Sequence, residues 1–178
     1  MVTKKTALIL VTFIAFGLQA SESTEFATLK QQAKAGHAES MWLLAGHCHN
    51  HKDFKRWVKW RNRFIIRVLQ DAACSTDKST IAALDVVKME NMSMKNEDRQ
   101  ALQELYPNEQ DRLQQALKYL AWIEKNFATL PEPYWIARYG METSFMGKEV
   151  KSLFVSLSEC QKKRKEVIEQ FRKEWSLK

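Results

Sequence analysis

The sequence has few residues that interrupt regular structure and few that carry redox or metal chemistry. Only five glycines, three prolines and three cysteines occur among its 178 residues. No stretch alternates apolar and polar residues between turn signals, so β-strands are not indicated. The glycine-rich phosphate loop, the GxSxG motif, paired CxxC motifs and the HExxH zinc motif are all missing. These absences argue against an enzyme with a recognisable local motif and leave helical patterns to define the fold.

The N-terminus has the composition of a secretory signal peptide. Lys4 and Lys5 precede the apolar run 7–17, and Ala20 follows before a polar segment. An apolar run of this length is too short to span a bilayer comfortably, which favours cleavage over a permanent anchor. We therefore predict a signal peptide over residues 1–20 and a periplasmic or secreted mature chain over residues 21–178.

The chain carries an excess of positive charge. Its formal net charge is +7, and loss of Lys4 and Lys5 leaves 28 − 2 = 26 basic residues against 21 acidic ones, or +5. Such an excess favours acidic partners. We expect another envelope protein with an acidic contact surface, or an anionic membrane surface. Export argues against nucleic acid as a partner.

Apolar residues recur at three- and four-residue steps through most of the mature chain, which is typical of amphipathic helices. The longest such stretch runs from Phe54 to Cys74 without glycine or proline, and Asp53 is its predicted N-cap. We also expect helices that begin near Ser23 or Thr24, near Ala38, at Ser79 and at Asn108 or Glu109, and a last helix with apolar positions from Val150 to Trp175. The predicted fold is one all-α domain of about seven helices, either a bundle or a short array of α-hairpins. The hairpin part covers residues 24–92 and the C-terminal helices cover residues 97–178.

Residues 29–57 resemble the Sel-like repeat family, relatives of the tetratricopeptide repeats. Such repeats pair an alanine-rich helix that ends at glycine with a helix that has a small residue after leucine, followed by aspartate and an aromatic residue. The matching positions are Ala33, Gly36, Ala38, Leu44, Ala45, Asp53 and Trp57. A second, fainter match extends to residue 84. The glycine-rich loop of the family is replaced by residues 47–52, and nothing after Leu105 matches. The resemblance implies stacked α-hairpins and a protein-binding role.

The helix expected after Asp53 has a face rich in cationic and aromatic residues. Tryptophan and arginine dominate the energetics of many protein interfaces. We therefore predict a partner-binding face made of Arg56, Lys59, Trp60, Arg63 and Arg67. The alternative is that the aromatic residues belong to the core, and the exposure of Trp60 distinguishes the two. The predicted function is non-catalytic binding of an envelope protein, with an inhibitor or immunity protein of a toxin as one specific form.

Three cysteines in an exported chain predict one disulfide and one free thiol. A straight helix over residues 54–73 separates its ends by about 30 Å. Cys48 then cannot reach Cys74, because bonded cysteines have Cα atoms within about 7 Å of each other. We predict a disulfide between Cys74 and Cys160. A Cys48–Cys160 pair and three reduced cysteines are the alternatives.

The sequence also offers candidates for two other functions. His47, His49 and His51 form a local cluster of soft ligands, and His47 and His51 would face one way on a helix, which suits zinc or copper. A solvated helix end is the alternative interpretation, and we expect no cofactor unless this cluster holds one. An enzyme would need carboxylates in a cleft, for which Glu132, Glu142 and Glu149 near Tyr134, Trp135 and Tyr139 are the candidates.

Overall fold

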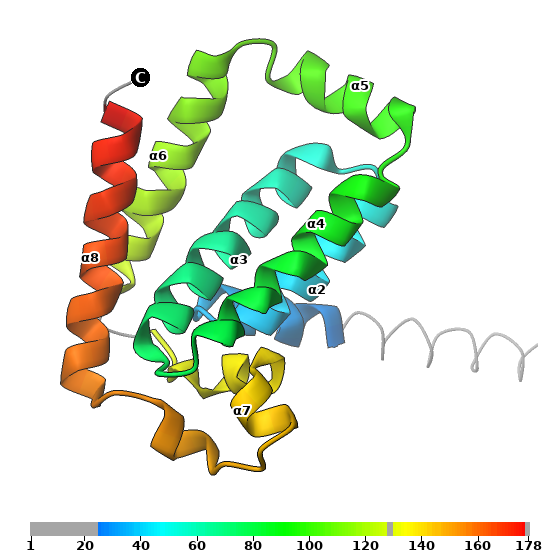
Figure 1. Cartoon of the computed structure of the whole chain (residues 1–178). Helices are drawn as coiled ribbons and strands as arrows, with labels where there is room; N and C mark the ends of the chain where they lie inside the picture. Colours follow the sequence, from blue (N-terminus) through cyan, green and yellow to red (C-terminus); the bar gives the residue numbers. More distant parts are fainter. Residues whose placement is uncertain (1–24, 128–129, 177–178) are drawn as a thin grey trace, which may run out of the picture.

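The fold is built around one long central helix, α3 (Phe54–Cys74). The computed structural model describes residues 25–127 and 130–176. On one side of α3 lie α2 (Ala38–Asn50) and α4 (Ala83–Ser93), and on the other lie α6 (Glu109–Lys125) and α8 (Leu157–Ser176) (Figure 1). The short helix α5 (Asn96–Leu105) crosses one end and connects α4 to α6. No strand occurs in the described ranges, so the all-α prediction is confirmed.

The bounds of α3 follow from its capping residue. The side chain of Asp53 accepts a hydrogen bond from the backbone N–H of Arg56, as expected of an N-cap. The helix then continues for 21 residues without a glycine or proline to interrupt it. Because other helices pack around it, α3 is buried on nearly all sides, including positions that carry charge.

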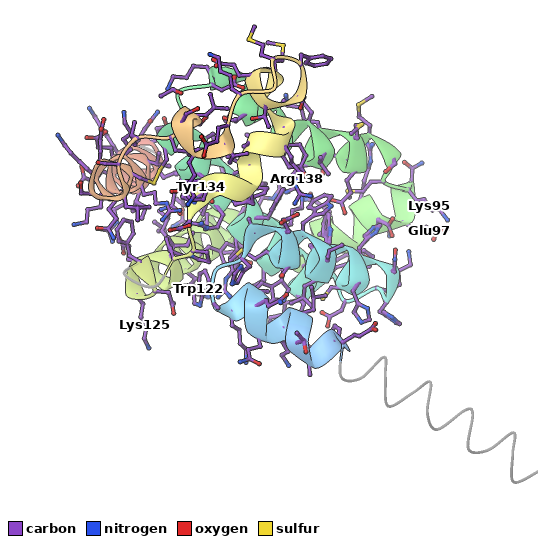
Figure 2. The ribbon with its side chains drawn as sticks, turned by 90° about the horizontal axis from the view of Figure 1, so that it is seen from below. Lys95, Glu97, Trp122, Lys125, Tyr134 and Arg138 are labelled. Carbon is purple, nitrogen blue, oxygen red and sulfur yellow. A yellow bond between two sulfur atoms is a disulfide. The ribbon has the colours of Figure 1, made fainter. Side chains whose placement is uncertain are left out.

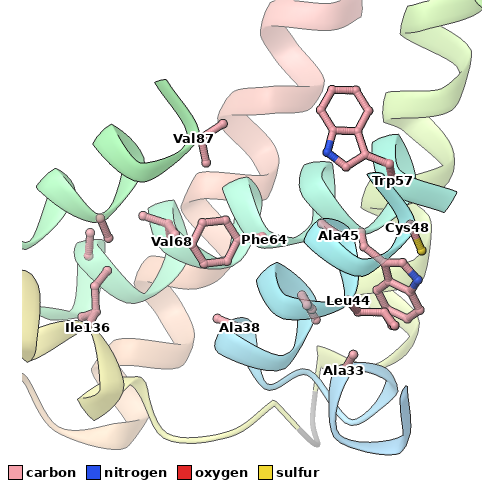
Figure 3. Close-up of a cluster of buried hydrophobic side chains, with 14 residues drawn as sticks. Ala33, Ala38, Leu44, Ala45, Cys48, Trp57, Phe64, Val68, Val87 and Ile136 are labelled. Carbon is pink, nitrogen blue, oxygen red and sulfur yellow. The ribbon is translucent and has the colours of Figure 1, made fainter. Parts of the chain in front are cut away.

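The N-terminal hairpin packs against α3 through small and apolar residues. Residues 25–34 are helical, and Gly36 ends this helix with a φ of +98°, a conformation that favours glycine. A Cβ atom at Gly36 would approach Leu130 Cδ2 to 2.9 Å, so the turn also requires the absence of a side chain. Ala38, Leu44 and Ala45 then meet Trp57 and Phe64 of α3 in the main core cluster (Figure 3).

The segment after α3 differs from the expectation that Ser79 caps the next helix. The cap is Asp77, whose carboxylate accepts from the Ser79 N–H at the start of a 3-10 helix, η1 (Lys78–Ala82). The other carboxylate oxygen of Asp77 accepts from the N–H of Glu142 in α7 (Met141–Ser144). Asp77 therefore holds two segments that lie far apart in the sequence. Burial by itself would raise the pKa of Asp77, but the hydrogen bonds from the Ser79 hydroxyl and from the two backbone N–H groups lower it overall.

The C-terminal helix begins later than its apolar pattern predicts. Val150–Leu153 forms a separate 3-10 turn, η4, and α8 starts at Leu157. Between them Phe154 is extended and forms an isolated bridge with Ser75. The backbone N–H of Val155 donates to the Cys74 carbonyl. These hydrogen bonds to the end of α3 interrupt the helix that the spacing alone would continue. A further 3-10 helix, η3 (Pro133–Tyr139), begins with a proline and precedes α7.

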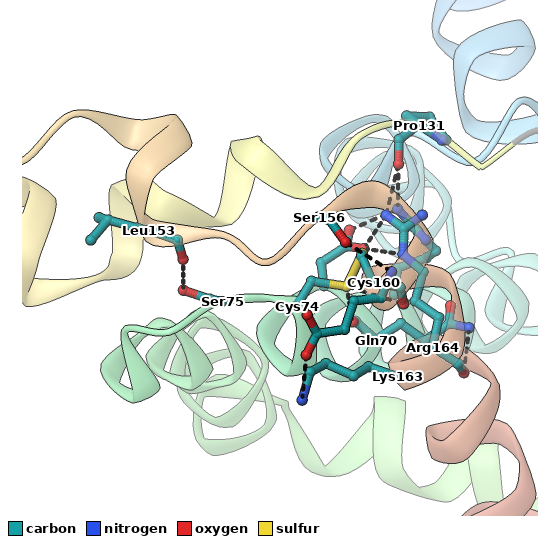
Figure 4. Close-up of a disulfide and its surroundings, with 12 residues drawn as sticks. Gln70, Cys74, Ser75, Pro131, Leu153, Ser156, Cys160, Lys163 and Arg164 are labelled. Atoms are coloured by element: carbon teal, nitrogen blue, oxygen red, sulfur yellow. Dashed lines mark hydrogen bonds and ion pairs between the residues drawn. A yellow bond between two sulfur atoms is a disulfide. The ribbon is translucent and has the colours of Figure 1, made fainter.

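A disulfide joins the C-terminal end of α3 to the first part of α8. Cys74 and Cys160 are bonded, with Cα atoms 4.8 Å apart, which confirms the predicted pair (Figure 4). Cys48 is a buried free thiol, and burial raises its pKa. One turn along α8, Arg164 reaches Asp71 of α3, so covalent and ionic links between these helices lie close together.

The predicted signal peptide, residues 1–20, lies outside the described residues. Within the described ranges, no helix combines the length and the apolar character that crossing a membrane requires.

Candidate functional site

The aromatic part of the predicted partner-binding face lies in the interior, so this prediction of an exposed face is wrong. Trp60 is only 4 % exposed and Trp57 only 2 % exposed. Arg63 and Arg67 are also buried. The physical reason is the central position of α3, which leaves no broad solvent-facing side on this helix.

The buried arginines are stabilised by aromatic rings and by a carboxylate. The guanidinium carbon of Arg63 lies 3.7 Å from the centroid of the Trp122 ring and 4.8 Å from that of Trp60. Arg67 donates to Asp71, 2.7 Å away. Burial lowers the pKa of Arg63 to about 10, so the group stays charged at neutral pH. A cation stacked on aromatic rings tolerates burial better than an isolated one.

Arg56 and Lys59 are the two predicted binding residues that remain accessible. The Arg56 side chain is 70 % exposed and forms an ion pair with Asp53. Lys59 is half-buried, and its pKa is lowered first by burial and then by the charges of Arg63 and Lys34. A basic surface thus persists beside the helix at residues 25–34, although without the exposed tryptophan that was expected.

The three clustered histidines divide between two environments. The rings of His47 and His51 lie 4.4 Å apart, in agreement with their spacing of one helical turn. His49 points elsewhere, with its Nε2 atom 3.2 Å from Asp98 of α5. Three imidazoles therefore do not converge on one ion, and no group of three or more metal-ligating side chains occurs in the described ranges. The predicted three-histidine site is wrong in its geometry, because residues two positions apart on a helix point in different directions.

The carboxylates proposed for an enzyme site have other structural contacts. Glu142 pairs with Lys148. Trp135 donates its indole N–H to Asp71, 2.7 Å away, and its ring packs edge-on against Tyr139. Glu132 and Glu149 are exposed. The aromatic segment thus contributes to packing around the buried arginines.

A groove of about 590 Å³ lies between α3, the end of α4, α5 and the start of α6. Its volume lies within the range of roughly 300–1,000 Å³ that is common for ligand pockets. The apolar part of its wall comes from Trp57, Val58, Met94, Leu102 and Tyr106. We call this feature the α5 groove. Burial raises the pKa of Tyr106, so its phenol remains neutral in ordinary buffers.

Three guanidinium groups surround the α5 groove. Arg61 lies against the Trp57 ring, 5.5 Å from its centroid, and donates to the Asn91 side chain at 2.9 Å. Arg112 donates to the Tyr106 carbonyl and to Gln103. Arg99 is exposed on α5. Glu90 lies 3.9 Å from Arg61 and accepts a hydrogen bond from the Trp57 indole N–H. Among the described residues that line the groove, three are arginines and none is aspartate or glutamate.

The described side chains that line the α5 groove are apolar groups, amides, guanidinium groups and one phenol. Among the described residues that line it, there is no carboxylate, imidazole, thiol or aliphatic hydroxyl. A nucleophile with an adjacent base is the usual minimum for covalent or general-base catalysis. Apolar walls with nearby guanidinium groups instead match a ligand that is apolar along its length and carries an anionic group.

An ion pair between a buried carboxylate and an exposed lysine holds α5 at the outer wall of the α5 groove. Asp98 of α5 is 2 % exposed and accepts from Lys52 at 2.7 Å, beside His49. The hydrogen bond from Lys52 and the charges of Lys52 and His49 lower the pKa of Asp98. Because Arg99 is the next residue, this contact also places the exposed guanidinium at the groove.

Sequence reasoning missed the α5 groove because its walls come from four separate elements. Residues 91–98 are polar and show no apolar period, although the acidic pair Glu97 and Asp98 occupies the first turn of α5. Acidic residues in a first turn are a helix-start signal. That signal predicts the helix, but neither its packing partner nor the space beneath it.

The comparisons with known proteins supply no family. A scan of protein-family models, a search of curated proteins and a search of solved structures each found no match. The resemblance of residues 29–57 to Sel-like repeats therefore stays a prediction.

Proposed function

We propose that this chain is an exported, non-catalytic binding protein that holds an apolar, acidic segment of another envelope protein in the α5 groove. The single observation that carries the proposal is the composition of the groove, which combines an aromatic and aliphatic wall with three arginines. An amphipathic helix in a groove is a common mode of peptide recognition. An inhibitor or immunity protein of an envelope-acting toxin is the specific form that we favour.

Charge supports this choice of partner. The excess of arginine over glutamate at the α5 groove favours a carboxylate on the partner, and arginine binds carboxylates with well-defined geometry. The accessible Arg56 and Lys59 add positive charge elsewhere on the surface, which would speed encounter with an acidic protein.

Site-specific photo-crosslinking in the producing cell tests the proposal. A photoreactive amino acid replaces Gln115, a half-buried residue of the groove wall. The matched control carries it at Lys125, an exposed residue of the same helix that lies away from Lys95 and Glu97 at the start of α5 (Figure 2). We expect a discrete protein adduct from position 115 and none from position 125.

An adduct of equal yield at both positions, or none at position 115, would contradict the proposal. A defined adduct is then mapped by mass spectrometry. The account expects the crosslinked peptide of the partner to contain apolar residues and at least one aspartate or glutamate.

A further inference from the structure

A second cavity, of about 260 Å³, lies where the N-terminus of α2 meets Arg67 and Pro131. Its wall includes His37, Ala38, Glu39 and Ser40, which open α2, together with Trp135 of η3. None of these residues lines the α5 groove. We call it the Arg67 cavity. Its volume is below the usual size of roughly 300–1,000 Å³ for drug-sized ligands, so its occupant must be small.

Arg67 lines this cavity, and two of its side-chain nitrogen atoms have no hydrogen-bond partner among the described residues. Its side chain is 0 % exposed, and its Nη2 atom donates to Asp71. Its Nε and Nη1 atoms are buried and have no hydrogen-bond partner among the described residues. Burial lowers the pKa of Arg67 to about 10, with Asp71 opposing that effect, so the group is still a cation at neutral pH. Buried donors without partners are rare and call for a specific explanation.

The buried charges around Arg67 do not balance. Arg67 and Arg164 share one carboxylate, that of Asp71, and all three side chains are at most 5 % exposed. Arg164 also donates to the Pro131 carbonyl at 2.7 Å (Figure 4). The cluster thus has one positive charge in excess in an environment where water screens it poorly.

Two acidic residues at the cavity do not offset this excess. Glu39 forms an ion pair with Arg138, and its side chain is 46 % exposed. Glu132 is exposed. Charges in contact with solvent are strongly screened, whereas Arg67 is not. His37 is exposed and caps α2 only through its backbone.

The N-terminus of α2 supplies a second set of donors. This helix has 13 residues, and no side chain among the described residues caps it. The first backbone N–H groups of a helix have no partner within the helix, and the helix dipole places partial positive charge there. Such an end is a favourable place for an anion. Ser40, in the first turn, is buried, and its hydroxyl donates to Gln32.

We propose that the Arg67 cavity binds a small oxyanion, a carboxylate or a phosphate group, between the guanidinium of Arg67 and the N-terminus of α2. The anion accepts from the unpartnered N–H groups of Arg67 and from the first N–H groups of α2. It also neutralises the excess positive charge of the Arg67, Asp71 and Arg164 cluster. This site is independent of the α5 groove, and its failure would leave the proposed binding function untouched.

Nuclear magnetic resonance titration of the whole mature protein tests the site. Inorganic phosphate and acetate are added separately at pH 7 and constant ionic strength. We expect saturable shifts of the backbone N–H signals of Ala38, Glu39 and Ser40 and of the Arg67 Nε–H signal. Saturation with phosphate alone assigns the phosphate class, and saturation with acetate alone assigns the carboxylate class. Shifts that stay linear with both anions would overturn the proposal.

Two substitutions and one control link the binding to these residues. Arg67→Met removes the buried donors and should weaken binding by about tenfold or more, since hydrogen bonds to charged groups are strong. Ser40→Asp places a carboxylate in the first turn of α2, so it should raise the Tm and abolish anion binding even if Arg67→Met does not fold. Asn50→Asp, the control, adds the same charge at the exposed last residue of α2 and should bind as the unmodified protein does. Unchanged anion affinity in Arg67→Met, or in Ser40→Asp, would overturn the assignment.

Discussion

Replacement of Asp71 by asparagine tests how the centre of this fold accommodates its buried charges. The carboxylate is fully buried and accepts from four N–H donors, which belong to Arg67, Arg164 and Trp135. Asparagine keeps the shape of the side chain but removes its negative charge. Its NH₂ group would replace one carboxylate oxygen and would then point at N–H donors that it cannot accept from. Two buried guanidinium groups would then lack their counter-ion.

The magnitude follows from the cost of a buried charge without its partner. Removal of one partner of a buried ion pair typically costs about 3–5 kcal/mol. For a chain of this size each kcal/mol lowers the Tm by about 2–4 °C, so the expected decrease is roughly 6–20 °C. The assay is urea unfolding followed by circular dichroism, with the disulfide intact.

A matched control is Asp85→Asn, in an exposed carboxylate that pairs with Lys88 one turn along α4. Its effect should stay within about 0.5 kcal/mol, as for most surface substitutions. If Asp71→Asn lowers the free energy of unfolding by less than about 1 kcal/mol, or by no more than the control does, the buried cluster does not depend on this carboxylate and the reasoning fails.

Three further predictions concern separate contacts. The double substitution Cys74→Ser/Cys160→Ser removes a disulfide between residues 86 positions apart in the chain. It should lower the free energy of unfolding in urea by about 4–5 kcal/mol, because the unfolded chain gains conformational freedom. A decrease below about 1 kcal/mol would contradict this prediction. The pKa of Asp77 is lower in the folded state than its ordinary value of 3.8, so its contribution to stability is present above that pH and is lost as the pH falls through the folded pKa. Asp77→Asn should therefore reduce the urea midpoint more at pH 7 than at a pH below 3.8, and an equal reduction at both pH values would count against the linkage. Gly36→Ala should destabilise the fold by about 1 kcal/mol or more, because of the positive φ and the contact with Leu130. Gly46→Ala, in the open part of α2, should stabilise it by about 0.5–1 kcal/mol. A change in the free energy of unfolding of the same sign in both variants would refute the role of Gly36.

The parts of the fold that depend on local chemistry are predictable from the sequence. The capping carboxylate of Asp53, the stop at Gly36 and the apolar spacing of α6 each act within a few residues, so α3, the first hairpin and α6 appear where expected. The length of α3 also ruled out a Cys48–Cys74 bond, and the structure then selects Cys74–Cys160 over the alternative Cys48–Cys160 pair. Val150–Leu153 departs from its helical pattern because hydrogen bonds to Cys74 and the bridge to Ser75 compete with it.

The nature of the site depends on contacts between distant residues, which a single sequence does not reveal. Arg67 looks like a surface cation until Asp71 and Arg164 are seen to meet across 93 positions in the chain. Trp60 and Arg63 look like an exposed binding pair until Trp122 of α6 is found to lie against the guanidinium. The α5 groove likewise exists only because α5 crosses the end of α3, held by Asp98 and Lys52.

The most direct test of the binding function is a charge reversal at the α5 groove, measured by isothermal titration with the partner captured by crosslinking. Arg99→Glu changes an exposed groove residue, and Lys125→Glu makes the same change of charge on the far part of α6. We expect Arg99→Glu to raise the Kd by about tenfold or more, equivalent to about 1.4 kcal/mol of binding free energy. The Kd of Lys125→Glu should stay close to that of the unmodified protein. Equal affinities for both variants would contradict the assignment of the partner to the α5 groove.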